Sequence, residues 1–100
     1  MLTQENVINK LREVLPILKK EYGVAKIGIF GSYSRQEQSS KSDVDIFIEF
    51  KKPIGLAFMD LANYLEKILR RKVDILTPEG IKSIRVHEIA QYIKENLVYI

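Results

Sequence analysis

The sequence predicts an α/β (α+β) fold in which helices flank a small mixed β-sheet. Apolar residues recur at helical spacing in the first and later segments, short apolar runs lie between them, and glycine or proline separates the segments. The 100 residues are 46% hydrophobic and 29% charged, which is typical of a globular fold of this length. We therefore assign residues 1–100 to a single domain.

The first segment, residues 3–22, is expected to be a helix. Thr3 is a suitable N-cap, and Gly23 follows two lysines in the way that commonly marks a helix end. Pro16 is expected to kink or divide this helix, because proline has no N–H to donate.

The remaining segments alternate between strand and helix patterns. Residues 43–50 are the clearest strand, since apolar and polar side chains alternate along them. The expected order is a strand at 25–30, a short helix at 32–38, the strand at 43–50, a helix at 55–70, a strand at 72–76, a helix that starts at Pro78 after the N-cap Thr77, and a final helix that carries Ile84, Ile89, Ile93 and Leu97.

Two aspartates open the strand at 43–50. Asp43 and Asp45 project from the same face of a strand, with Cα atoms ~7 Å apart, so their charges repel unless a cation lies between them. Mg²⁺ prefers such oxygen ligands, and a suitable strand register would add Asp74 and allow two metal ions ~4 Å apart, as in phosphoryl transfer. The alternative is a polar turn at the strand entry, in which Asp43 bonds local backbone.

A glycine and a serine precede this strand. Gly31 lets backbone N–H groups approach a phosphate, and the Ser32 hydroxyl adds a donor. Arg35 is positioned to neutralise a phosphate oxygen, although pairing with a carboxylate is an equal alternative. Tyr33 lies inside the turn and is expected to pack near a bound nucleotide.

These segments together resemble a known family. The letters GS, ten further residues and then DVD, with the flanks IGIFGSYSR, SDVDIFIEF and KVDIL, are similar to the signature of DNA polymerase β-like nucleotidyltransferases, in particular the minimal (MNT) type. The resemblance implies that Gly31 and Ser32 hold the nucleotide phosphates, that Asp43 and Asp45 bind both metals, and that Asp74 completes the metal site and acts as the base.

One position departs from the family pattern. The family commonly has glycine after the arginine, as in GSYARG, whereas this chain has Gln36. If the position needs a positive φ, Gln36 is expected to strain the turn and to affect nucleotide affinity.

The resemblance also implies a partner and a reaction. MNT proteins pair with HEPN-domain toxins and, as antitoxins, transfer AMP from ATP to a tyrosine of the toxin, with two Mg²⁺ ions as cofactors. The 100-residue length leaves no room for a second domain, so we expect a hetero-oligomer with such a toxin. The alternatives are a nucleotidyltransferase that modifies RNA or tRNA, and an antitoxin that acts by binding alone.

Composition bears on partners and location. The net charge of +3 and the pI near 9.2 favour anionic ligands such as a nucleotide triphosphate, without favouring nucleic acid. The chain has no cysteine, no apolar run of ~20 residues and no leader pattern, so we expect a cytoplasmic protein with no membrane partner.

Overall fold

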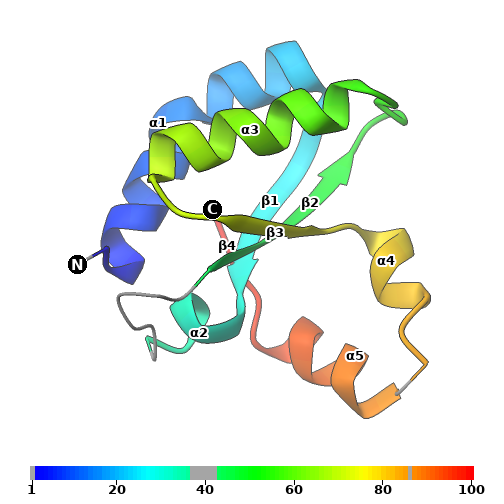
Figure 1. Cartoon of the computed structure of the whole chain (residues 1–100). Helices are drawn as coiled ribbons and strands as arrows, with labels where there is room; N and C mark the ends of the chain where they lie inside the picture. Colours follow the sequence, from blue (N-terminus) through cyan, green and yellow to red (C-terminus); the bar gives the residue numbers. More distant parts are fainter. Residues whose placement is uncertain (1, 37–42, 86) are drawn as a thin grey trace.

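The computed structural model describes residues 2–36, 43–85 and 87–100, apart from the side chain of Ser32. Figure 1 shows helices on both sides of a twisted sheet. The elements are α1 (Gln4–Tyr22), β1 (Val24–Phe30), α2 (Gly31–Ser34), β2 (Val44–Phe50), α3 (Ala57–Leu69), β3 (Val73–Leu76), α4 (Pro78–Lys82), α5 (His87–Glu95) and β4 (Val98–Tyr99).

The described strands form one mixed sheet in the order β3-β2-β1-β4. β1 is antiparallel to both β2 and β4, whereas β2 and β3 are parallel. The parallel pair is connected through α3, which crosses over one face of the sheet (Figure 1). The predicted fold class, a small mixed sheet flanked by helices, is therefore confirmed.

The two faces of the sheet pack against different helices. Val44, Ile46 and Ile48 of β2 join buried residues of α1 and α3 in the larger core. Phe47 points to the opposite face, where it packs with Ile81 and Ala90 of α4 and α5. This alternation is the predicted one, and it decides which strand residues are available for a site.

The first helix begins and ends as predicted. The Thr3 hydroxyl accepts a hydrogen bond from the Asn6 N–H (3.1 Å), and the Asn6 side chain accepts one from the Thr3 N–H (3.2 Å). Gly23 ends the helix in the left-handed conformation, with φ of 66°. Pro16 does not divide the helix: it lies on an exposed side, where water lowers the cost of the missing hydrogen bond.

The C-terminus differs from the prediction. The final helix ends at Glu95, Ile84 lies before it, and the last residues form β4 along β1. Gly28 of β1 makes this pairing possible, because a Cβ atom there would lie 2.9 Å from the Val98 carbonyl oxygen. No helix in the described ranges has the length and apolar character that a membrane crossing requires.

Candidate active site

Strand register brings two of the predicted carboxylates together. In the parallel pair, Asp45 of β2 lies beside Asp74 of β3, and their side chains share a hydrogen bond. Asp43 lies just before β2 and is exposed, and its charge also acts on Asp45. The structure thus places Asp45 and Asp74 at one end of the sheet, on the face that carries Phe47, with Asp43 nearby, just before the start of β2.

The electrostatics of Asp45 reflect this clustering. The pKa of Asp45 is raised from 3.8 to about 6, mainly by burial and also by the negative charges of Asp74 and Asp43. The positive charge of Arg35 acts in the opposite direction. A half-buried carboxyl with two acidic neighbours binds a proton readily, and a cation can take the place of that proton.

Residue 31 must be glycine, because its backbone lies directly against the Asp45 carboxylate. It begins α2 directly after β1 and has a φ of 70°, a conformation that side chains disfavour. A Cβ atom at this position would lie 2.9 Å from Cγ of Asp45. The turn and the carboxylate therefore form one continuous surface, which a side chain at residue 31 would disrupt.

Arg35 lies between the carboxylates and the last helix. It is the C-cap of α2, and its guanidinium carbon lies 5.6 Å from the centroid of the Tyr92 ring in α5. Its charge also reaches Asp45, as the pKa of that group indicates. No sequence signal indicated Tyr92, because it lies 57 residues after Arg35 and its position depends on how α5 packs.

The other residues of the turn have different outcomes. The prediction for the Ser32 side chain, like any that involves residues 37–42, lies outside the described residues. The prediction that Tyr33 packs near a bound nucleotide is wrong. Its ring is fully buried in the larger core, and its hydroxyl has no hydrogen-bond partner among the described residues. Gln36 has a φ of 58°, so this position does need the left-handed conformation.

The aspartates suit a divalent cation by their chemistry. Within the described ranges, no three Asp, Glu, His or Cys side chains are close enough together to form a metal site as they stand. Asp45 and Asp74 nevertheless supply hard oxygen ligands in adjacent register, and their side chains lie close enough to share a hydrogen bond. This donor set fits Mg²⁺ better than a softer metal.

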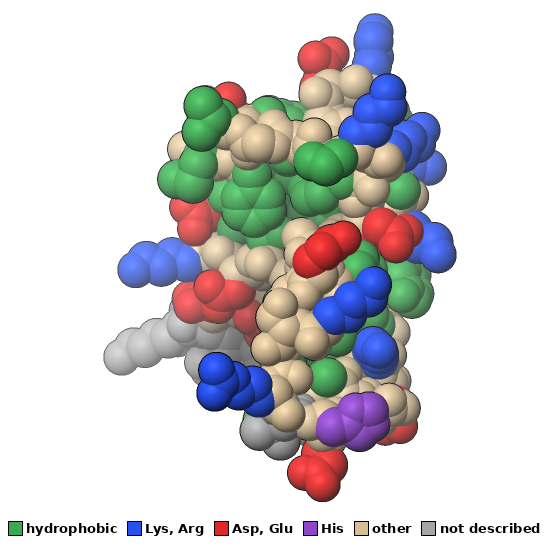
Figure 2. All heavy atoms as spheres, turned by 90° about the vertical axis from the view of Figure 1, so that its right-hand side faces the viewer, with side chains coloured by type: hydrophobic (Ala, Val, Ile, Leu, Met, Phe, Trp, Pro, Cys, Tyr) green, Lys and Arg blue, Asp and Glu red, His purple; other side chains and the backbone are tan. Residues whose placement is uncertain are grey.

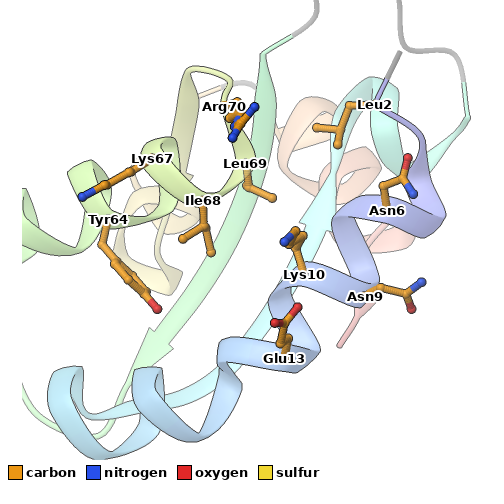
Figure 3. A pocket seen from close by; sticks show the side chains of 10 residues that line it. All are labelled: Leu2, Asn6, Asn9, Lys10, Glu13, Tyr64, Lys67, Ile68, Leu69 and Arg70. Atoms are coloured by element: carbon orange, nitrogen blue, oxygen red, sulfur yellow. The ribbon is translucent and has the colours of Figure 1, made fainter.

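Cavity size does not identify this site. A cavity of about 700 Å³ lies between α1 and α3 (Figure 3) and is lined by residues that include Asn6, Lys10 and Ile68. These helices cover the face of the sheet opposite Asp45. Apolar side chains gather in the upper half of the face shown in Figure 2. Two exposed apolar residues, Leu56 and Met59, are 91% and 63% exposed and follow the far end of β2.

Comparison with solved structures supports the fold. A proposed minimal nucleotidyltransferase superposes with a TM-score of 0.76 at 21% identity, over 97% of this chain and 95% of that one. A toxin–antitoxin complex with AMP-PNP superposes with a TM-score of 0.63 at 25% identity, over 98% of this chain and 72% of that one. Tri-AMPylated Shewanella oneidensis HEPN toxin in complex with MNT antitoxin gives a TM-score of 0.54 at 23% identity, over 96% of this chain and 66% of that one.

Sequence comparison covers nearly the whole chain. The protein adenylyltransferase MntA of Thermococcus cleftensis is 38% identical over 101 residues, which span 100% of this chain and 98% of the relative. Residues 11–100 match the family described as the nucleotidyltransferase domain. With the glycine turn and the aspartates on one face of the sheet, this match shows that the chain belongs to the nucleotidyltransferase-domain family.

Proposed function

We propose that the chain is an ATP- and Mg²⁺-dependent protein adenylyltransferase that transfers AMP to a tyrosine hydroxyl of a HEPN toxin and thereby acts as its antitoxin. The observation that carries this proposal is the register that sets Asp45 beside Asp74, next to the turn at Gly31. The adenylyltransferase name of the Thermococcus relative and the AMPylated HEPN toxin of the Shewanella complex support the choice of acceptor.

The chain's residues divide the work of binding and positioning. Backbone N–H groups of the turn that begins at Gly31, together with Ser32, bind phosphate oxygens of ATP. Arg35 neutralises negative charge on the same phosphates and is oriented by the Tyr92 ring. Asp43, Asp45 and Asp74 would hold two Mg²⁺ ions, which would supply charge neutralisation for the phosphoryl transfer.

The reaction is an in-line displacement at the α-phosphorus of ATP. The tyrosine oxygen forms a bond to this phosphorus while the bond to the bridging oxygen of pyrophosphate breaks, and pyrophosphate leaves with the electron pair. Asp74 accepts the tyrosine proton; it is more exposed than Asp45 and lies at the sheet edge, where an acceptor can reach it. Positioning and electrostatic stabilisation supply most of the rate.

The proposal is tested by label transfer. The purified protein is incubated with α-³²P-ATP and Mg²⁺, with and without lysate of its own host, and the products are treated with RNase or protease before a denaturing gel. We expect a protease-sensitive band that Asp45→Asn and Asp74→Asn abolish. Asp60→Asn is the matched control, because Asp60 is an exposed aspartate in the first turn of α3.

The other outcomes distinguish the alternatives. An RNase-sensitive band would replace the protein acceptor with RNA. The absence of any label, combined with tight binding of a HEPN protein, would mean that the chain acts as an antitoxin by binding alone. Labelling that persists in both aspartate variants would contradict the assigned roles of the carboxylates.

A further inference from the structure

The turn at residues 31–36 is connected to the first helix by a side chain that no motif indicated. The Gln4 side-chain amide donates a hydrogen bond to the Ser34 carbonyl (3.0 Å). The same side chain accepts a hydrogen bond, through its oxygen, from the Gln36 side-chain amide (3.1 Å). Gln4 thus contacts the backbone and a side chain of the turn across 30 and 32 positions of sequence.

This connection lies where the turn needs support. Gln36 has a φ of 58°, and a residue other than glycine populates this conformation only when its surroundings favour it. The backbone bonds that close the turn are long: the Arg35 N–H reaches the Gly31 carbonyl at 3.3 Å, and the Gln36 N–H reaches the Tyr33 carbonyl at 3.3 Å. The Gln4 hydrogen bonds therefore compensate for an unfavourable backbone conformation.

Gln4 itself is held firmly. It is the first residue of α1, directly after the N-cap Thr3, whose capping box fixes the start of the helix. One and two turns later, Val7 and Leu11 are fully buried in the larger core. The helix that forms the core is thus also a rigid support for the turn, and Gln4 is the point of contact.

We propose that Gln4 is a positioning residue for the nucleotide turn, and that the Gln4–Gln36 pair replaces the conformational freedom that glycine would give at position 36. This inference rests on the proposed function, because the turn is assigned to the phosphates of ATP. Gly31 fixes one end of the turn against Asp45, and Gln4 fixes the other end against α1. Arg35 lies between these two points.

The first test measures ATP affinity in a double-mutant cycle. Titration calorimetry with ATP and Mg²⁺ compares the wild type with Gln4→Ala, Gln36→Gly and the double variant. We expect Gln4→Ala to weaken binding about 3- to 10-fold, as the loss of one or two ordinary hydrogen bonds would. Gln4→Ala should weaken ATP binding less in the Gln36→Gly background than in the wild type, because glycine adopts the left-handed conformation without support.

The second test does not depend on ATP. Hydrogen exchange of the Arg35 and Gln36 amides reports whether the turn is held in the free protein. We expect Gln4→Ala to accelerate exchange of both amides about 10-fold, and Gln91→Ala to leave them unchanged. Gln91 is the matched control, because its amide makes a 3.0 Å hydrogen bond to Glu95 on the exposed side of α5.

The two tests separate this inference from the proposed function. Unchanged exchange in Gln4→Ala would overturn the positioning role, whether or not ATP binds. A wild-type protein that binds no ATP, but whose turn exchanges faster in Gln4→Ala, would overturn the nucleotide assignment and leave the positioning role supported. A Gln4→Ala variant with lower thermal stability but unchanged ATP affinity and exchange would show that Gln4 is merely structural.

Discussion

The two faces of the sheet differ in how completely they are covered. On one face, α1 and α3 bury a large apolar core in which Leu11, Ile46 and Leu65 are fully inaccessible. On the other face, the buried residues of the described part of the chain are Phe47, Ile81 and Ala90, which pack with α4 and α5, and Tyr92 remains 49% exposed. The carboxylates lie on this thinly covered face, so stability comes mainly from one side of the sheet and the proposed chemistry takes place on the other.

The largest expected effect is a loss of core packing. Leu65→Ala removes a fully buried side chain from α3 and should lower the free energy of unfolding by about 3 kcal/mol. Leu97→Ala, on the thin face, should cost about half as much, because this side chain is only half-buried. Urea unfolding measures both free energies. Equal losses of unfolding free energy in the two variants would contradict the claim that the two faces contribute unequally to stability.

The next comparison uses two glycines with the same backbone conformation. Gly23 and Gly31 have φ values of 66° and 70°, but only a Cβ at residue 31 would meet another group, the Asp45 carboxylate. Alanine at either position should destabilise by about 1 kcal/mol through φ alone. Gly31→Ala should additionally abolish ATP binding by calorimetry, whereas retained affinity would mean that the turn does not contact the phosphates.

A smaller effect, of opposite sign, is expected at Asp45. The pKa of Asp45 in the folded protein, about 6, exceeds its ordinary value of 3.8, so the folded state binds the proton more tightly. The contribution of Asp45 to stability is therefore fully present below about pH 4, is lost as the pH rises from about 4 to 6, and does not change further above that. Asp45→Asn should raise the melting temperature at pH 7.5 and have little effect at pH 4.

Thermal melts of the wild type and Asp45→Asn at pH 4 and pH 7.5 test whether the substitution raises the melting temperature at the higher pH. Added Mg²⁺ should stabilise the wild type at pH 7.5 and leave Asp45→Asn unchanged, because a cation relieves the repulsion that the substitution removes. A melting temperature that falls in Asp45→Asn at pH 7.5 would show that the carboxylates do not repel one another in the folded chain.

The smallest expected effect is at the contact between Arg35, at the end of α2, and Tyr92 of α5. Tyr92→Leu removes the aromatic face under Arg35 and should weaken ATP binding about 2- to 3-fold, in line with a partly exposed cation–π contact. Tyr99→Leu serves as the control, because the Tyr99 ring packs edge to face on Phe47 instead. Equal effects of the two substitutions in calorimetry would exclude a specific role for Tyr92.

The thickly covered face was the easier one to predict from the sequence. Helical spacing and strand alternation depend on local burial, and they predicted α1, β2 and α3 to within a few residues. β4 was missed because a strand of two residues is too short to show an alternation of apolar and polar side chains. A glycine inside a strand, such as Gly28 of β1, is the one signal in the sequence for the close approach of another backbone.

The positions of the candidate site residues were predictable where they depend on residue type and on spacing along the sequence. The spacing of Gly31, Asp43 and Asp45 identified the turn and the strand entry, and Asp74 required only a suitable strand register. The contacts of Gln4 with Gln36 and of Arg35 with Tyr92 join distant segments through helix packing. Such contacts depend on tertiary geometry and leave no periodic trace in a single sequence.

The parallel pairing of β2 and β3 has a consequence for the fidelity of folding. A slip of one residue in β3 would turn Asp74 toward the apolar core under α1 and α3 and would turn Val73 and Ile75 toward the site. A carboxylate buried there without a partner is strongly unfavourable. Asp74 therefore also favours the correct strand register, because a chain with the shifted register would lose both stability and its proposed activity.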